Sequence, residues 1–342
     1  MSDLSPISRR HALRITAGVG LGAAFGLSLG REALWRAGLH QVRETKIQMG
    51  TVVTLTVVHS EKTAAREMID QAFGEMERLE SVLSRYRRSS AVGRLNATGR
   101  LEDAPQPLVE VLNLALDVSH RSRGAFDVTI APLLELHGSS FDRWGRPPTD
   151  REVVEVLSYV GYEGLSMAGS KVVFADPRMA ISLDGIAKGF IVDRVVAKLS
   201  SDGAERVMVD AGGDIAASRS SERHDAWTVG VQDPRRHEAM VGRVQLDQGG
   251  VATSGDYFRH FTPDRRHHDI LDPRTGRSPA GLSSASVLAP SAAEADALST
   301  AALVMGQVDG ILLIDAYEGA EALLVSKDGH YAKSRAMGRR LI

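Results

Sequence analysis

Residues 46–86 read KIQMGTVVTLTVVHSEKTAAREMIDQAFGEMERLESVLSRY, and they join two kinds of secondary structure. The first part, Lys46–His59, is rich in Val and Thr and partly alternates apolar with polar residues, which predicts a strand. From Glu61 to about Tyr86 the apolar residues recur every three or four positions, which predicts a long amphipathic helix. A strand and a helix are therefore expected in direct succession.

The segments after residue 86 mix helices and strands without a regular alternation. A second helix is predicted from Pro107 to about Arg123, and the capping box of Thr149 and Glu152 predicts a third. Short strands are predicted at Lys171–Phe174, Met179–Leu183, Arg206–Asp210, Ala226–Val231, Gly242–Leu246, Leu323–Val325 and Tyr331–Lys333, and the first two and the last two of these are expected to pair. The patterns predict an α+β fold over residues 39–342, a single globular unit with mixed, largely antiparallel sheets and packed helices.

The first 38 residues have the composition of a twin-arginine export signal. Arg9 and Arg10 precede an apolar run, Ile15–Leu29, which is short and weakly hydrophobic for a membrane span. We therefore expect export in the folded state and a periplasmic location. An uncleaved signal that tethers the protein to the inner membrane, and a basic arm beside a buried helix, are the alternatives.

The overall composition excludes several classes of function. The 342 residues include 41 basic and 43 acidic residues that are well mixed, with a formal net charge of -2, so nothing indicates nucleic-acid binding. The chain has no cysteine, which excludes disulfides, thiolate nucleophiles, zinc–thiolate sites and iron–sulfur clusters. Any metal must be bound by oxygen or imidazole.

The most informative chemical motif is Ala293–Ala301, where small residues surround Asp296 and Thr300. These two residues are four apart, so on a helix they lie on one face. A carboxylate and a hydroxyl together suit a hard cation such as Mg²⁺. The alternative is that Asp296 only interacts favourably with the helix dipole.

Three glycine-containing segments predict close approach of the backbone to a ligand. Ile181–Gly189 is expected to run from a strand through glycine into a helix, where Lys188 reaches an anionic group or forms a surface ion pair with Asp184. Asp210–Asp214 and Gly249–Tyr257 are expected to be tight loops.

The segment His267–Gly276 joins two adjacent histidines to an Asp-Pro-Arg-Thr-Gly turn. It is either a His/Asp metal cluster or the site of one histidine acting as an acid or base. Adjacent residues on a strand point to opposite faces, which favours one functional histidine.

Taken together, these segments resemble the ApbE family, the FAD:protein FMN transferases. The resemblance spans nearly all of the chain after the signal and implies an ApbE-like, T-fold-like unit. The motifs that carry it are, in chain order, Met49-Gly50-Thr51, Ser84-Arg85-Tyr86, Gly124-Ala125-Phe126-Asp127, Leu183–Gly189, Asp210–Asp214, Ser254-Gly255, Leu271–Gly276 and Ala295-Asp296-Ala297.

The resemblance implies roles for particular residues. Mg²⁺ on the FAD pyrophosphate would be held by Asp296, Thr300 and the carbonyl of Gly185. Contacts to the flavin and adenosine would come from Met49, Tyr86, Ala125, Phe126, Asp127, Ser182, Lys188 and Ile270. His268 would be the catalytic base, although Asp269 fills the slot where the family often has its histidine. Many relatives have Asp at position 182 and Gly at position 184, which leaves open whether Ser182 or Asp184 contacts the ligand.

The activity implied is Mg²⁺-dependent transfer of FMN from the substrate FAD to a Thr or Ser hydroxyl of an exported or membrane redox protein, with release of AMP. The signal and the His-rich turn also resemble the accessory members tied to nitrous oxide reduction. An FAD pyrophosphatase and a non-catalytic flavin-binding assembly factor are the alternatives. The expected partners are FAD and an acceptor protein with a flavinylation motif.

Overall fold

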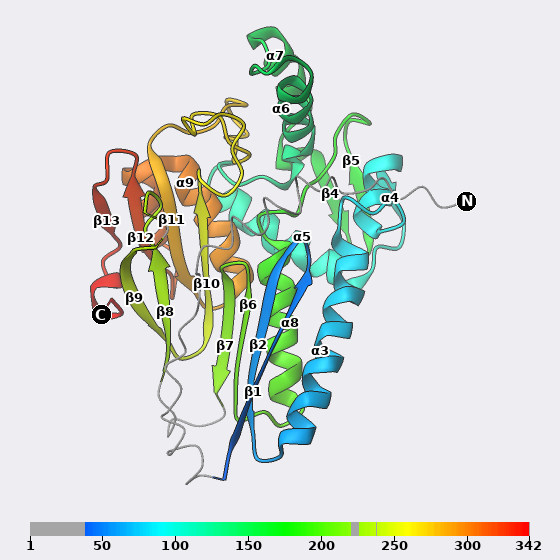
Figure 1. The fold of residues 1–342 in the computed structure, drawn as a ribbon. Coiled ribbons are helices and arrows are strands. Elements are labelled where there is room, and N and C mark those ends of the chain that lie inside the picture. Colours follow the sequence, from blue (N-terminus) through cyan, green and yellow to red (C-terminus); the bar gives the residue numbers. More distant parts are fainter. Residues whose placement is uncertain (1–37, 220–225, 237, 342) are drawn as a thin grey trace.

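The computed structural model describes residues 38–219, 226–236 and 238–341 (Figure 1). The predicted export signal lies outside these residues, except for residue 38. The first element is a hairpin of β1 (His40–Gln48) and β2 (Thr51–His59). The single strand predicted from Lys46 to His59 is therefore wrong. Met49 and Gly50 have φ angles of 52° and 70°, and two consecutive left-handed residues reverse the chain as in the tight turns of β-hairpins.

An eight-stranded sheet forms the centre of the structure (Figure 1). Its strands follow the order β1, β2, β6 (Arg206–Ala211), β7 (Asp214–Arg219), β10 (Gly249–Gly255), β11 (Leu282–Ala289), β12 (Glu321–Ser326) and β13 (Tyr331–Lys333). All neighbours are antiparallel, which confirms the predicted α+β class with largely antiparallel sheet. The tight loop predicted at Gly249–Tyr257 is wrong, because residues 249–255 form β10, which pairs with both β7 and β11.

Both faces of this sheet are covered. On one face lie α3 (Lys62–Leu83), α8 (Ala187–Ser201) and α9 (Ala292–Asp315), with α5 (Gln106–Arg121) against α9 and α3. On the other face, the hairpin of β8 (Trp227–Gln232) and β9 (Met240–Leu246) buries Trp227 against a second apolar cluster that includes Met208 and Val251. The helices on the first face carry the polar residues considered below.

The remaining elements gather near one end of the large sheet (Figure 1). They are α4 (Ala91–Thr98), η1 (Val128–Ile130), α6 (Ala131–Trp144), α7 (Asp150–Leu157), η2 (Tyr162–Gly164) and the small sheet β3 (Arg100–Leu101), β5 (Lys171–Phe174) and β4 (Leu165–Ala168); η3 (Met337–Arg339) lies near the C-terminus. The predicted capping box of Thr149 and Glu152 is confirmed at the start of α7.

The strand predicted at Met179–Leu183 is wrong. β5 pairs with β3 and β4 instead. The backbone of Ile181 is hydrogen-bonded by a side chain: Asn96 Nδ2 donates to its carbonyl over 2.9 Å, and its amide donates to Asn96 Oδ1 over 2.8 Å. The Asn96 side chain therefore bonds both the amide and the carbonyl of Ile181, which a neighbouring strand would otherwise bond. The segment continues as an irregular connection into α8.

By length and composition, α9 is the one helix in the described part of the chain that could cross a membrane, with a mean hydropathy of 1.7. It packs against β10, β11 and α8, and its buried residues belong to the main core. Its apolar composition is therefore that of a core helix.

Candidate active site

Asp296, Thr300 and the backbone of Gly185 lie where α9 faces the connection into α8. Asp296 and Thr300 lie one turn apart on α9, as the sequence predicts. A Cβ atom placed on Gly185 would lie 3.2 Å from Thr300 Oγ1, so the backbone of this connection passes directly against the helix. Ser254, at the end of β10, is 3.0 Å from Thr300 through their hydroxyl oxygens. A side chain at position 185 would fill the space beside Thr300, which explains the glycine.

Asp296 is a buried carboxylate with little compensation from its surroundings. It is 4% exposed, and its side-chain hydrogen bond is a long one of 3.4 Å from the Gly189 amide to Oδ2. Burial raises the pKa of Asp296, and the positive charge of nearby Lys188 opposes this shift. A buried charge of this kind is costly unless a cation or strong hydrogen bonds compensate it.

Lys188 does not form the expected surface pair with Asp184. Its ammonium is paired with Asp214, a buried residue at the start of β7. The turn between β6 and β7 thus brings a second carboxylate to the first turn of α8. With Lys188 engaged by Asp214, Asp296 lacks a direct ion pair in the described residues.

The donor set fits a hard cation. In the described residues, no group of three or more His, Cys, Asp or Glu side chains could hold a metal ion. The structure instead places the carboxylate of Asp296 and the hydroxyl of Thr300 near the backbone of Gly185, whose carbonyl the resemblance implies as the third donor. A carboxylate, a hydroxyl and a backbone oxygen are donor types that Mg²⁺ accepts while it keeps waters and substrate oxygens in its other positions. The alternative that Asp296 only favours the helix dipole loses support, since its carboxylate faces the Gly189 amide of α8 and not the first amides of α9.

A second polar cluster surrounds Asp184. Arg85 Nε and the Tyr86 hydroxyl both donate to Asp184 Oδ2, over 2.9 and 3.0 Å. Tyr86 is 65% exposed, and Arg259 interacts with it electrostatically. This cluster presents an aromatic ring, two guanidinium groups and a carboxylate at the surface.

Asp269 faces the same cluster. Its amide donates to the Arg259 carbonyl over 3.2 Å, and its carboxylate interacts electrostatically with Arg259, Asp184 and Arg85. Burial raises the pKa of Asp269 to about 6, with the charge of Arg259 acting in the opposite direction. Asp269 is therefore a carboxylate able to exchange a proton near neutral pH.

His268, the predicted base, points elsewhere. It is fully buried, its Nε2 is 3.3 Å from the Pro279 carbonyl, and its Nδ1 has no hydrogen-bonding partner in the described residues. Burial and the charge of Lys327 lower the pKa of His268 to about 4. Its charged neighbours, Lys327 and Asp256, belong to a separate ion-pair network with Arg235. The structure thus does not bring the imidazole to the cluster around Asp184.

The burial of His268 predicts an effect on acid stability. The unfolded state binds a proton near pH 6.5 and the folded state only near pH 4, so stability is lost as the pH falls between these values. The wild type minus His268→Gln difference in unfolding free energy should fall by about 2–3 kcal/mol from about pH 7 to about pH 4.5. Urea titrations at both pH values measure this difference, and a constant difference would show that the folded state protonates His268 normally.

Of the predicted ligand residues in the Ala125–Asp127 step, some border the site and some support the loop around it. The Phe126 ring lies 3.4 Å from a Cβ placed on Gly185, so it borders the same space, and buried Ala125 precedes it. Asp127 is buried, and its oxygens accept hydrogen bonds from the Thr129 amide and hydroxyl and the Tyr162 amide at 2.7–2.8 Å. Its carboxylate therefore organises this loop.

Ser182 and Asp184 differ in what they expose. The Ser182 hydroxyl is buried and accepts the Asp184 amide over 3.2 Å, whereas the Asp184 side chain is 39% exposed. The geometry favours Asp184 as the residue that reaches a ligand. Ile270 packs against the main core.

Met49 lies in the turn between β1 and β2. Its turn adjoins the turn between β6 and β7, where the Gly212 amide donates to the Val52 carbonyl over 3.1 Å. A Cβ on Gly212 would lie 2.2 Å from Thr51 Oγ1, so only glycine permits this approach. The turn that contains Met49 thus lies next to the turn that precedes Asp214, and Met49 packs against the main core.

Sequence reasoning missed the roles of Asp214 and Arg259. Asp214 lies within a motif that was noted, but its pairing with Lys188 joins residues 26 positions apart. Arg259 carries no motif signal, and only the fold places it beside Tyr86 and Asp269.

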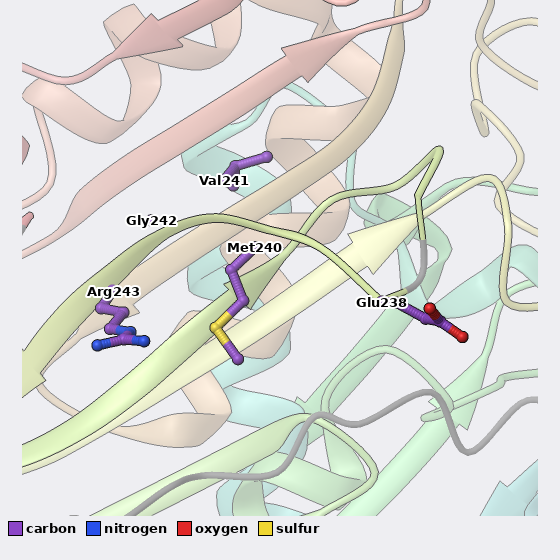
Figure 2. A pocket seen from close by; sticks show the side chains of 5 residues that line it. All are labelled: Glu238, Met240, Val241, Gly242 and Arg243. Carbon is purple, nitrogen blue, oxygen red and sulfur yellow. The ribbon is translucent and has the colours of Figure 1, made fainter.

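A separate pocket of about 620 Å³ lies along β9 (Figure 2). It is lined by Glu238, Met240, Val241, Gly242 and Arg243. None of the predicted site residues lines it, so it makes no contribution to the site described above.

Comparison with known proteins identifies the fold and the family. The model of the ApbE family matches residues 49–324. The FAD:protein FMN transferase of Treponema pallidum is 31% identical over 320 residues and that of Salmonella typhimurium 28% over 306, each alignment covering 86% of both chains.

Solved structures agree with this result. The ApbE protein of Thermotoga maritima superposes with a TM-score of 0.80 at 30% identity, covering 88% of this chain and 99% of that one. The flavinyl transferase ApbE of Pseudomonas stutzeri, in its apo form, gives 0.78 at 29% identity, covering 88% and 97%. The chain therefore belongs to the ApbE family.

Proposed function

We propose that this protein is a Mg²⁺-dependent transferase that moves FMN from FAD to a Thr or Ser hydroxyl of an exported or membrane redox protein and releases AMP. The names of the relatives, FAD:protein FMN transferase, support flavin transfer to a protein. The observation that carries the proposal is the buried, poorly compensated Asp296 beside Thr300 and the Gly185 backbone. Such a site is suited to a cation and the pyrophosphate that accompanies it.

Within this proposal, Asp296, Thr300 and the Gly185 carbonyl would hold Mg²⁺, and the chemistry that it would supply is neutralisation of charge on the pyrophosphate oxygens. The acceptor hydroxyl attacks the phosphorus on the FMN side, a new P–O bond forms, and the bond to AMP breaks. Lys188, oriented by Asp214, adds positive charge beside Asp296.

We assign the base to Asp269 in place of His268. A base must accept the hydroxyl proton as the new bond forms, and it must be ionised near neutral pH. Asp269 faces the exposed cluster of Tyr86, Asp184 and Arg259, and its pKa of about 6 suits this task. His268 is enclosed in the core and interacts with a different network.

We further propose that the reaction takes place in the periplasm, where the twin-arginine signal would deliver the folded enzyme. An uncleaved signal would attach the enzyme to the inner membrane beside its acceptor. The Arg9-Arg10 pair and the apolar run after it support this location.

The test is to incubate the purified mature protein with FAD, Mg²⁺ and a candidate acceptor that bears a flavinylation motif. We expect covalent flavin fluorescence on the acceptor in a denaturing gel, and none when a chelator is present, because the pyrophosphate then lacks its cation. Free FMN and AMP without a labelled acceptor would indicate the pyrophosphatase. Bound FAD without either product would indicate a flavin-binding assembly factor.

A further inference from the structure

The first amides of α9 are bound by two different elements. The Ala292 and Ala293 amides donate to Asp193 Oδ1 and Oδ2 over 2.8 and 2.9 Å, and the Glu294 amide donates to Ser291 Oγ over 3.1 Å. Ser291 is a local cap, of the kind that most helices have. Asp193 belongs to α8, so its carboxylate joins two helices that are about 100 residues apart in the sequence.

The same face of α8 touches α9 one turn earlier. Gly189 precedes Asp193 by four residues, and a Cβ placed on it would lie 2.3 Å from the Ala292 carbonyl oxygen. The Gly189 amide also donates to Asp296 Oδ2. Gly189 and Asp193 on α8 therefore contact Ala292, Ala293 and Asp296 on α9, and any shift between the helices moves the Asp296 carboxylate.

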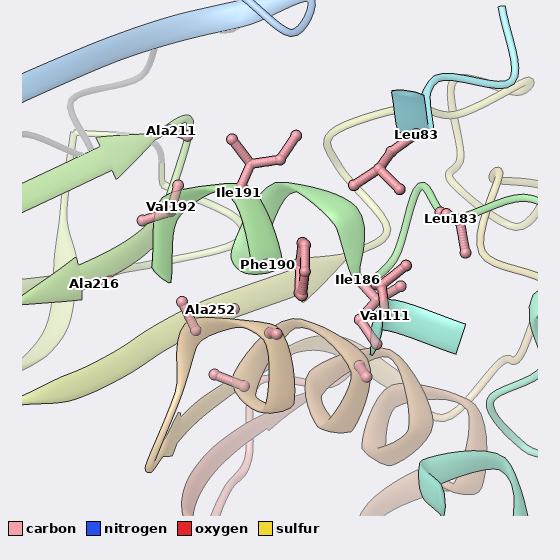
Figure 3. Close-up of a cluster of buried hydrophobic side chains, with 14 of the residues drawn as sticks. Leu83, Val111, Leu183, Ile186, Phe190, Ile191, Val192, Ala211, Ala216 and Ala252 are labelled. Carbon is pink, nitrogen blue, oxygen red and sulfur yellow. The ribbon is translucent and has the colours of Figure 1, made fainter. Parts of the chain in front are cut away.

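Apolar packing alone does not define this register. Figure 3 shows Phe190 and Ile186, at the start of α8, beside α9. Ala292 and Ala293, at the start of α9, are buried and contact Gly189 and Asp193 of α8. Packing brings the two helices close together, because a Cβ on Gly189 would overlap the Ala292 backbone, but apolar contacts are not directional. The bidentate carboxylate supplies a directional constraint, since each oxygen is held by a separate amide.

We propose that Asp193 is a positioning residue that fixes α9 against α8 and thereby holds Asp296 in the geometry needed for its divalent cation. This rests on the proposed function only in assigning the cation to Asp296. The proposed role of Asp193 is indirect, because its two oxygens accept hydrogen bonds from the amides of α9.

The test measures Mn²⁺ binding by electron paramagnetic resonance in the presence of FAD and without an acceptor, so that no turnover is needed. Asp193→Ala should weaken Mn²⁺ binding by about 10–100-fold, the range for residues that orient metal ligands. Asp193→Asn retains one acceptor oxygen and should fall between this variant and the wild type. The control is Asp202→Asn at the exposed end of α8, where Asp202 pairs with Lys198, and it should bind as the wild type does.

A second readout separates positioning from a general loss of structure. FMN transfer by Asp193→Asn should approach the wild-type rate at saturating metal, with the defect confined to the metal concentration required. If Asp193→Ala does not fold, Asp193→Asn carries the test. Wild-type Mn²⁺ affinity in a folded Asp193 variant, with only a lower Tm, would overturn the proposal. Failure of the wild type to label any acceptor would count against the proposed function and leave the order of Mn²⁺ affinities unchanged.

Discussion

Asp296→Ala is expected to reduce FMN transfer by about a hundred- to a thousandfold or more, the loss seen when a main electrostatic stabiliser of a transition state is removed. The carboxylate is the charged member of the proposed donor set, so its removal leaves a hydroxyl and a backbone carbonyl. The measurement is the initial rate of acceptor labelling across a range of Mg²⁺ concentrations.

Asp296→Ala should not lower the stability of the metal-free protein, although it lowers activity. Asp296 is buried with one long hydrogen bond, so the folded protein gains little from its charge in the absence of metal. We expect the metal-free unfolding free energy of Asp296→Ala to equal or exceed that of the wild type. Asp309→Ala, at an exposed position of α9 beyond the kink at Gly306, is the control and should change neither quantity. Normal transfer by Asp296→Ala at limiting Mg²⁺ would contradict the metal assignment.

Asp269→Asn is expected to lower the rate of transfer by about 10²–10⁴-fold, the contribution of a positioned general base. FAD binding should be nearly unchanged, because the amide keeps the shape of the side chain. The neighbouring variant His268→Gln is the matched control, and near pH 7 it should transfer FMN at close to the wild-type rate.

The assignment of Asp269 as the base also predicts how the transfer rate depends on pH. A carboxylate base works when ionised, so the wild-type rate should rise as the pH increases through about 6 and then level off. Burial is the main cause that raises the pKa of Asp269; Asp184 raises it further, and Arg259 and Arg85 lower it. The residual rate of Asp269→Asn should lack this step. A large loss in His268→Gln, with Asp269→Asn active, would restore the histidine as the base.

Local patterns were sufficient for elements whose signals lie within one segment. The periodic apolar residues of α3 and the reciprocal cap of Thr149 and Glu152 predicted their helices, because these features depend on neighbours three or four residues away. The turn at Met49 was missed because its left-handed conformation involves a methionine, which carries no turn signal.

The glycines of β10 were misleading for a different reason. Gly249 and Gly250 suggest a loop, but they lie in a strand against the start of α9, where a Cβ on Gly250 would be 2.2 Å from the Cα of Ala292. Tertiary packing requires glycine at position 250, whereas Gly249 also has a φ angle of 95° that favours glycine. The sequence shows that a position is glycine, but it does not show whether a turn or close packing requires the glycine.

In the candidate site, too, features set by local geometry were predicted and contacts between distant segments were not. The spacing of Asp296 and Thr300 correctly placed both on one face of a helix, since helical geometry alone fixes this. The partner of Lys188 and the direction of His268 depend on contacts between distant segments. The alternation of an extended chain favoured one functional histidine of the pair His267 and His268, but the structure buries His268 near Lys327 and Asp256, and it is Asp269 that lies near Arg259 and Asp184.

The most direct test of the proposed activity is the stoichiometry of its products. Mass spectrometry of the acceptor, with chromatography of the nucleotides from the same reaction, measures FMN bound to a Thr or Ser and AMP released. The proposal predicts one AMP for each FMN attached through a phosphoester, with both absent in Asp296→Ala. Equal amounts of AMP and free FMN with an unmodified acceptor would contradict it.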